Sequence, residues 1–152
     1  MNSHKRHFCL LLLLVVFGAA VCEAKQIAVI VDKANTTTDI TLPDLLKILK
    51  GEGHKWPDGK NVVVVLRDLS TPEMQIAMQK IYKMQPDEFK AMVAAHKGAI
   101  TVAGSEEELL KMVSTTPGAI GLVDVYSITN QVSVLKVDGK LPLQQGYALK
   151  GN

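Results

Sequence analysis

Residues 62–73 read VVVVLRDLSTPE, and this stretch decides the fold class. Five apolar residues in a row, four of them valines, predict a strand that is buried on both faces. Arg67 and Asp68 end the strand. Ser70 or Thr71 then offers a hydroxyl to cap a helix that is predicted to reach about residue 84. A buried strand that leads into a helix is the repeating unit of α/β proteins.

The rest of the chain from residue 25 continues this alternation. Thr41, followed by Asp44, predicts the start of a helix that ends near Gly51. Ser105 with Glu108 has the spacing of a capping box. The last nine residues, 144–152, are expected to be loosely held. Further strands are predicted at 26–31, 119–123 and 132–137, and further helices at 86–96 and 105–114. This order predicts an α/β, three-layer sandwich with a mixed sheet.

The first 24 residues have the pattern of a secretory signal peptide. A basic stretch, residues 4–7, precedes an uncharged run of 15 residues, Phe8–Cys22. That run is shorter than the roughly 20 residues of a membrane-spanning helix. Cleavage after Ala24 is expected to leave one domain, 25–152, with no membrane span, in the periplasm or secreted. An alternative interpretation makes Cys22 a lipid attachment site.

Removal of residues 1–24 leaves a domain of nearly balanced charge. Without Lys5, Arg6 and Glu23, 15 basic and 14 acidic residues remain, a net charge of +1. This balance argues against nucleic acid as a partner. Cys9 and Cys22 both lie in the signal, so the domain has no disulfide and must depend on its core.

The strand-to-helix junction at Arg67–Thr71 is the first candidate site. A helix start presents unpaired N–H groups that attract anions, and an arginine can add a two-pronged contact to a phosphate. The Asp68 carboxylate can accept a hydrogen bond from the protonated oxygen of hydrogen phosphate. Sulfate has no such proton to donate. The alternative is a plain helix cap, with Arg67 paired to Asp68 in solvent. Glu73 places a negative charge in the same first turn and favours that alternative.

The polar loop 32–39 is the second candidate site. It contains Asn35 and three threonines, Thr36, Thr37 and Thr38, which offer neutral donors to an anion. The alternative is a solvated loop with no ligand. We expect these threonines to help the Arg67 junction.

Catalytic and metal-binding patterns are weak. The domain has two histidines, His54 and His96, and no cysteine partner for them. No nucleophile elbow, P-loop or dinucleotide motif is present. The sequence therefore predicts a binding protein, not an enzyme, and neither a metal nor another cofactor is expected.

Several segments, taken in order, resemble the substrate-binding proteins of phosphate ABC transporters. They are residues 26–31, residues 42–51, Lys55-Trp56-Pro57-Asp58-Gly59, the Arg67, Ser70 and Thr71 loop, and Pro117-Gly118-Ala119-Ile120-Gly121. The resemblance implies a solute-binding module for phosphate or a related small oxyanion, linked to ABC transport. It implies one lobe of a type II periplasmic binding protein, with a transporter permease as a partner.

The sequence also departs from this family. The receptors of this family have two lobes and are roughly twice as long as this chain. The chain resembles the short, single-domain proteins that are like phosphate receptors. Leu69 stands where the phosphate loop of the family has a small residue, and Leu122 replaces a tyrosine. The alternative function is therefore a degenerate interaction or scaffold protein of the cell envelope, with an envelope protein as its partner and no small ligand.

Overall fold

A computed structural model describes residues 24–152. The predicted signal peptide and the Cys22 lipid site lie outside the described residues. The strands are β1 (Ile27–Asp32), β2 (Asp39–Ile40), β3 (Val63–Leu66), β4 (Ile100–Val102), β5 (Ala119–Asp124) and β6 (Val132–Val137). The helices are α1 (Leu42–Leu49), α2 (Pro72–Ala77), α3 (Pro86–Ala95) and α4 (Glu106–Thr115), with a π-helix at Met78–Tyr82 and a 3₁₀ turn at Val125–Ser127.

The six strands form one mixed sheet in the order β2-β6-β1-β5-β3-β4. β1 lies near its middle and is antiparallel to both β5 and β6. β3 is parallel to β5 and to β4, and β2 is parallel to β6. Because β1 is antiparallel to β5, and β5 is parallel to β3, β1 and β3 run in opposite directions. The carboxyl ends of β1 and β3 therefore lie at opposite ends of the sheet, measured along the strands.

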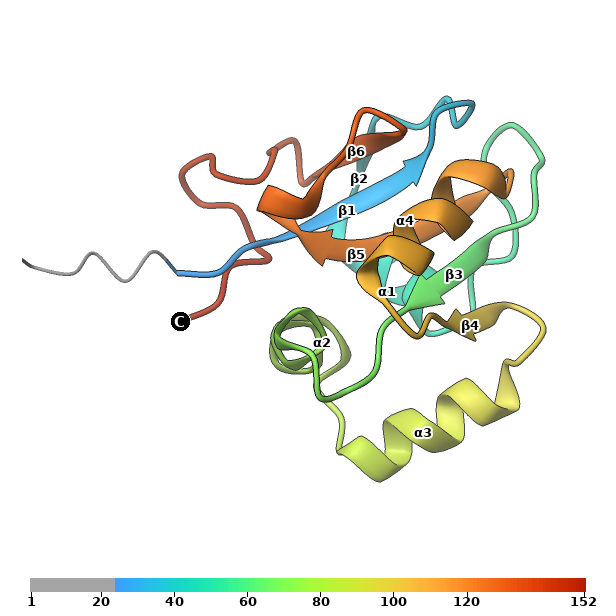
Figure 1. The fold of residues 1–152 in the computed structure, drawn as a ribbon, viewed down its shortest axis with the longest axis vertical. Helices are drawn as coiled ribbons and strands as arrows, with labels where there is room; N and C mark the ends of the chain where they lie inside the picture. Colours follow the sequence, from blue (N-terminus) through green and yellow to red (C-terminus); the bar gives the residue numbers. More distant parts are fainter. Residues whose placement is uncertain (1–23) are drawn as a thin grey trace, which may run out of the picture.

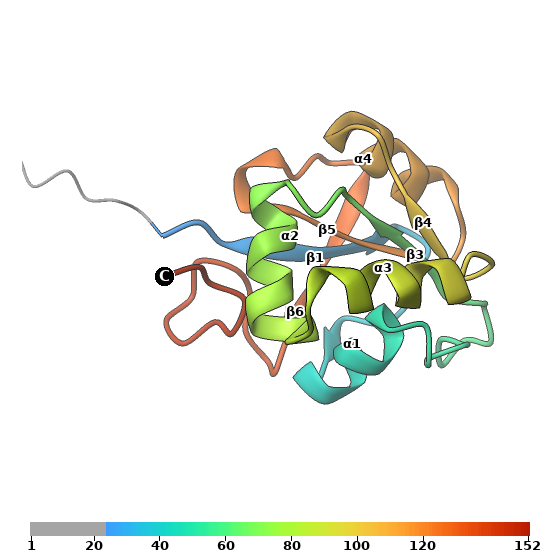
Figure 2. The ribbon, with the colours of Figure 1, turned by 90° about the horizontal axis from the view of Figure 1, so that it is seen from below.

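Helices cover both faces of the sheet (Figures 1 and 2). Alternate residues of β1 divide between two hydrophobic clusters, as expected of a strand. Ile27, Val29 and Val31 pack in the cluster that holds the buried side chains of α1, α2 and α3. Ala28 and Ile30 pack in the cluster that holds the buried side chains of α4. The predicted three-layer α/β sandwich with a mixed sheet is confirmed.

Two predicted helix starts have the expected hydrogen bonds. The Thr41 hydroxyl accepts a bond from the backbone N–H of Asp44, at 3.2 Å, and begins α1. The Ser105 hydroxyl accepts from the N–H of Glu108, at 3.0 Å, and begins α4. The Glu108 carboxylate reaches back to the N–H of Gly104, at 2.7 Å, one residue earlier than a capping box requires.

The helix predicted as continuous from about 71 to 84 is broken into two types. The α-helical part ends at Ala77, and Met78–Tyr82 form a π-helix. Lys83 ends it in a left-handed conformation, with φ of 50°. The wider turn places the Tyr82 hydroxyl in the core, where it donates to the carbonyl of Leu49 at 3.0 Å. A hydroxyl bond between distant segments is a tertiary preference that the local pattern of apolar residues does not reveal.

The prediction that residues 144–152 are loosely held is wrong. Tyr147 and Leu149 are buried, at 5% and 0% exposure. The Tyr147 hydroxyl donates to the carbonyl of Ile27 at 2.9 Å, and the Ile27 N–H donates to the carbonyl of Leu149 at 3.0 Å. The segment lies along the start of β1 and completes its hydrogen bonding.

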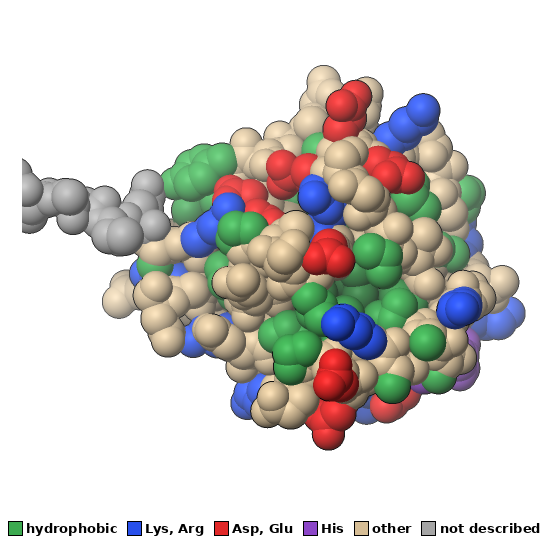
Figure 3. Space-filling view, turned by 60° about the horizontal axis from the view of Figure 1, so that its bottom comes forward, with side chains coloured by type: hydrophobic (Ala, Val, Ile, Leu, Met, Phe, Trp, Pro, Cys, Tyr) green, Lys and Arg blue, Asp and Glu red, His purple; other side chains and the backbone are tan. Residues whose placement is uncertain are grey.

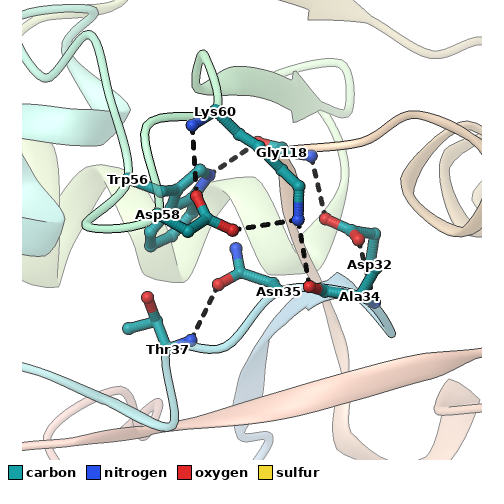
Figure 4. A network of polar contacts seen from close by, with 8 residues as sticks. All are labelled: Asp32, Ala34, Asn35, Thr37, Trp56, Asp58, Lys60 and Gly118. Carbon is teal, nitrogen blue, oxygen red and sulfur yellow. Dashed lines mark hydrogen bonds and ion pairs between the residues drawn. The ribbon is translucent and has the colours of Figure 1, made fainter.

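A buried cluster joins the end of β1 to the start of β5 (Figure 4). The Asp32 side chain, in a residue that is 4% exposed, accepts the N–H of Gly118 at 2.9 Å. The Trp56 indole donates to the carbonyl of Gly118 at 2.9 Å. Gly118 has φ of +79°, and a Cβ there would meet the carbonyl oxygen of Asn61 at 2.0 Å. The residue in this place must be glycine.

We expect Gly118→Ala to lower the free energy of unfolding by about 3 kcal/mol or more. A left-handed alanine costs about 1–2 kcal/mol, and overpacking of this kind adds about 1–3 kcal/mol. Urea denaturation measures the change. Gly59→Ala is the matched control, because Gly59 has φ of +87° with no atom near its added Cβ. Equal losses for the two variants would show that the contact with Asn61 is unimportant.

Candidate functional site

The loop between β3 and α2 forms a tight turn around Asp68. One carboxylate oxygen of Asp68 accepts both the backbone N–H of Ser70, at 2.9 Å, and the Ser70 hydroxyl, at 2.7 Å. The carbonyl of Asp68 accepts the N–H of Thr71, at 3.0 Å, and the Thr71 hydroxyl, at 2.8 Å. Four donors of the predicted anion loop are thus used within the loop itself.

The predicted cap of α2 is not made by a side chain. Thr71 occupies the N-cap position, but its hydroxyl makes no bond to the helix, and Pro72 follows as the first helical residue. The hydroxyl is turned back to the carbonyl of Asp68 instead. Thr71 therefore closes the turn through its N–H and its hydroxyl, which both donate to the Asp68 carbonyl.

Arg67 has a buried side-chain nitrogen, Nε, without a hydrogen-bond partner. Among the described residues its guanidinium forms no ion pair, so the alternative in which Arg67 pairs with Asp68 is wrong. Arg67 as a whole is half-buried, and its Nε shares this unsatisfied state with the Asn35 amide nitrogen and the Thr37 hydroxyl. Buried polar groups in proteins are nearly always satisfied. An arginine with free donors at a strand end is a candidate contact for an anion.

The electrostatics of the turn favour a charged Asp68. Hydrogen bonds from the backbone and then the hydroxyl of Ser70 lower the pKa of the Asp68 carboxyl, with smaller contributions from the charges of Lys90 and Arg67. The carboxylate therefore holds both donors of Ser70 within the turn.

The negative charge of Glu73, which argued against an anion site, is paired with the positive charge of Lys25. Lys25 lies 3.0 Å from the Glu73 carboxylate and 3.0 Å from that of Asp124. Its hydrogen bonds to Glu73 and then Asp124 raise the pKa of Lys25. Lys25 precedes β1 and Asp124 ends β5, so the pair of bridges draws both strands to the start of α2.

The structure does not bring the second loop to this site. The loop that contains Thr36, Thr37 and Thr38 follows β1. The carboxyl end of β1 and Arg67 lie at opposite ends of the sheet, measured along the strands. Their predicted help to the Arg67 junction is wrong within one chain, because antiparallel pairing of β1 with β5 reverses its direction. The two candidate segments are separated by the length of the strands.

The Thr36–Thr38 loop belongs instead to the network around Lys60 (Figure 4). The Lys60 ammonium donates to Asp58, at 2.9 Å, and to the carbonyl of Ala34, at 3.1 Å. The Asn35 side chain accepts the N–H of Thr37 at 2.9 Å. The Asn35 amide nitrogen and the Thr37 hydroxyl are buried without a partner. These bonds hold the loop against the segment before β3.

Sequence reasoning missed the residues that face Arg67 across a cavity. They lie on α3, just beyond its end, and at the end of β4, and comprise Phe89, Lys90, Val93, Ala94, Lys97 and Val102. The spacing of residues 89, 90, 93 and 94 places them on one face of α3, and this signal was present in the sequence. It did not show which strand end that face would meet.

Two general features of the described residues bear on function. Within residues 24–152, no three His, Cys, Asp or Glu side chains stand close enough together to hold a metal ion. No helix in the same range is both long and apolar enough to cross a membrane.

Comparisons with solved structures identify the fold. An ABC-type phosphate transport receptor from Vibrio cholerae matches with a TM-score of 0.71 and 18% identity, over 84% of this chain and 54% of the receptor. PstS from Borrelia burgdorferi matches with 0.67 and 21%, over 86% and 56%. A phosphate binding protein from Stenotrophomonas maltophilia matches with 0.62 and 16%, over 79% and 41%.

The chain has the fold of one lobe of such a receptor. The chain spans about half the length of the Vibrio cholerae and Borrelia burgdorferi proteins. The predicted α/β fold with a likeness to one lobe of a binding protein is confirmed at the level of the fold. No family model matches the sequence, and no curated protein is similar enough to count as a relative.

We expect the Asp68 carboxyl to titrate below its ordinary pKa of 3.8. Because the pKa is lower in the folded state than in the unfolded state, these hydrogen bonds stabilise the fold above the unfolded pKa. The stabilisation is lost as the pH falls through the folded pKa. NMR titration of the Asp68 carboxyl carbon measures the value.

Ser70→Ala should raise this pKa part of the way, because the backbone N–H remains. Ser114→Ala, on α4, is the control and should leave it unchanged. A carboxyl of Asp68 that titrates at or above 3.8 in the unaltered protein would contradict the described turn.

Proposed function

We propose that this protein is an exported solute-binding module that holds phosphate or a related small oxyanion at the β3–α2 junction. Arg67 is the principal contact, Ser70 donates from its N–H and hydroxyl, and Thr71 positions the turn. The single observation that carries the proposal is the unpaired guanidinium of Arg67, with its buried Nε, at a strand end of a receptor-lobe fold. A binding role, and not catalysis, fits this arrangement.

In the proposed bound state, the anion replaces the Asp68 carboxylate as the acceptor of the two Ser70 donors. Its carboxylate now receives the two Ser70 donors that an oxyanion needs. Asp68 is exposed and tied only within its own turn, so a rotation of its side chain frees both donors. Once displaced, the carboxylate can accept a hydrogen bond from the protonated oxygen of hydrogen phosphate, which gives the site a means to prefer phosphate over sulfate.

The remaining parts of the proposal concern location and partners. Residues 1–24 act as the signal peptide, and residues 25–152 work in the periplasm or as a secreted protein. A permease of the ABC transporter class is the partner that the fold suggests. One lobe leaves part of the anion exposed to water, so affinity is expected to be lower than that of a site closed by two lobes.

Phosphate should stabilise the protein against heat. At about 100 times its dissociation constant, a ligand that binds only the folded state adds about 2.7 kcal/mol. Thermal unfolding with and without millimolar phosphate measures this gain. Arg67→Ala should abolish it, whereas Lys111→Ala, on the other face of the sheet, removes an equal charge and should keep it. An unaltered protein that shows no shift would remove the proposal.

Asp68→Asn should narrow the preference for phosphate over sulfate by about tenfold or more. A hydrogen bond to a charged group contributes about 1.5–3 kcal/mol, and the asparagine amide can donate to sulfate where a carboxylate cannot. Calorimetric titration with both anions measures the ratio. A preference that stays the same in the variant would mean that Asp68 does not contact the bound anion.

The second candidate function is an interaction or scaffold protein of the cell envelope that binds no small ligand. One observation favours it: the Ser70 and Thr71 donors are already satisfied inside the loop. On this alternative Arg67→Ala leaves the capture of a partner intact, while surface changes elsewhere abolish it. Loss of phosphate stabilisation together with loss of function in Arg67→Ala would decide against it.

A further inference from the structure

A cavity of 220 Å³ lies beside Arg67, between the β3–α2 loop, α3 and the end of β4. Its apolar lining comes from Leu69, Phe89, Val93, Ala94 and Val102, and its charged lining from Arg67, Asp68, Lys90 and Lys97. The space-filling view of this side of the molecule shows hydrophobic side chains gathered at its middle, with basic and acidic side chains around them (Figure 3). The cavity therefore combines an apolar wall with cations.

The apolar wall exists because α3 is only partly packed. Phe89 is the one buried residue of α3, and it meets the ring of Tyr82 edge to face, with centroids 4.9 Å apart. Val93, one turn further along, is half-buried. Val102, at the end of the edge strand β4, is 46% exposed. Burial of such a surface by a ligand would release water and favour binding by about 25 cal/mol per Å².

The charges around the cavity are unbalanced. Lys90 and Lys97, like Arg67, form no ion pair or side-chain hydrogen bond with any residue in the described range 24–152. Asp68 is the one acid of the lining, and its carboxylate is engaged by Ser70. Three cations face a single carboxylate that is already occupied. The surplus favours a ligand with negative charge at one end.

We propose that the preferred ligand is an organic phosphate or phosphonate that carries a compact apolar group. The anionic end lies at Arg67 and Ser70, and the apolar group lies against Phe89, Val93 and Val102. This inference rests on the proposed function, since it uses the same Arg67 contact, and it adds the class of ligand. The volume suits a small group: an apolar cavity of about 150 Å³ accommodates a benzene ring.

The test is a calorimetric series of inorganic phosphate, methylphosphonate, propylphosphonate, butylphosphonate and phenylphosphonate. Each carbon that enters the cavity should tighten binding by up to about fourfold, which corresponds to about 0.8 kcal/mol per buried methylene. We expect butylphosphonate and phenylphosphonate to bind about tenfold or more tightly than methylphosphonate. Butylamine, which carries the same chain with the opposite charge, should not bind.

Two variants of α3 separate the cavity from the anion contact. Ala94→Phe fills the cavity and should remove the gain with chain length, while inorganic phosphate binds as before. Ala91→Phe adds the same side chain at an exposed position of α3 outside the cavity lining, and should keep the gain. Circular dichroism of both variants checks that α3 is folded. Arg67→Ala should weaken every ligand of the series.

The outcomes distinguish this inference from the function on which it rests. Equal affinities along the series overturn the inference, and the proposed function then stands if inorganic phosphate still binds through Arg67. Tight binding of butylphosphonate with no binding of inorganic phosphate supports the inference and removes phosphate as the ligand. A gain with chain length that survives both Arg67→Ala and Ala94→Phe places the ligand elsewhere and overturns the inference.

Discussion

The hydrogen bond from the N–H of Gly118 to the buried carboxylate of Asp32 connects two of the central strands of this fold. It joins the end of β1 to the start of β5, although the residues are 86 positions apart in the chain. The carbonyl of the same glycine accepts the Trp56 indole and the N–H of Val63. The backbone of this one glycine thus contacts the end of β1 and the start of β3, at the start of β5. A buried carboxylate is tolerated here because strong donors satisfy it.

The two ends of the strands differ in their polar contacts. At one end of the strands, the side chains of Asp32 and Trp56 bond to the backbone of Gly118. Lys60 bonds there to Asp58 and to the carbonyl of Ala34. The Asn35 amide nitrogen and the Thr37 hydroxyl beside them are buried without a partner. At the other end, the cation of Arg67 is left unpaired.

Much of the secondary structure was predictable because its signals are local. The valine run of β3, the caps at Thr41 and Ser105, and the strands that became β5 and β6 each depend on neighbours within a few residues. The short strands β2 and β4, of two and three residues, were not predicted, because so few residues show no alternation. The C-terminal segment was mistaken for a loose end, since Tyr147 meets Ile27 across 120 residues.

The sequence by itself determined the α/β class and the order of the main elements, because strand, cap and turn preferences act over short distances. Only the tertiary structure decided that Thr36–Thr38 lie at the opposite end of the strands from Arg67, since strand direction depends on which strands pair. It also decided that Asp68 binds Ser70 and not Arg67, and that one face of α3 completes a cavity beside that arginine. Contacts between segments distant in the chain depend on the whole packing, and no local pattern of residues encodes them.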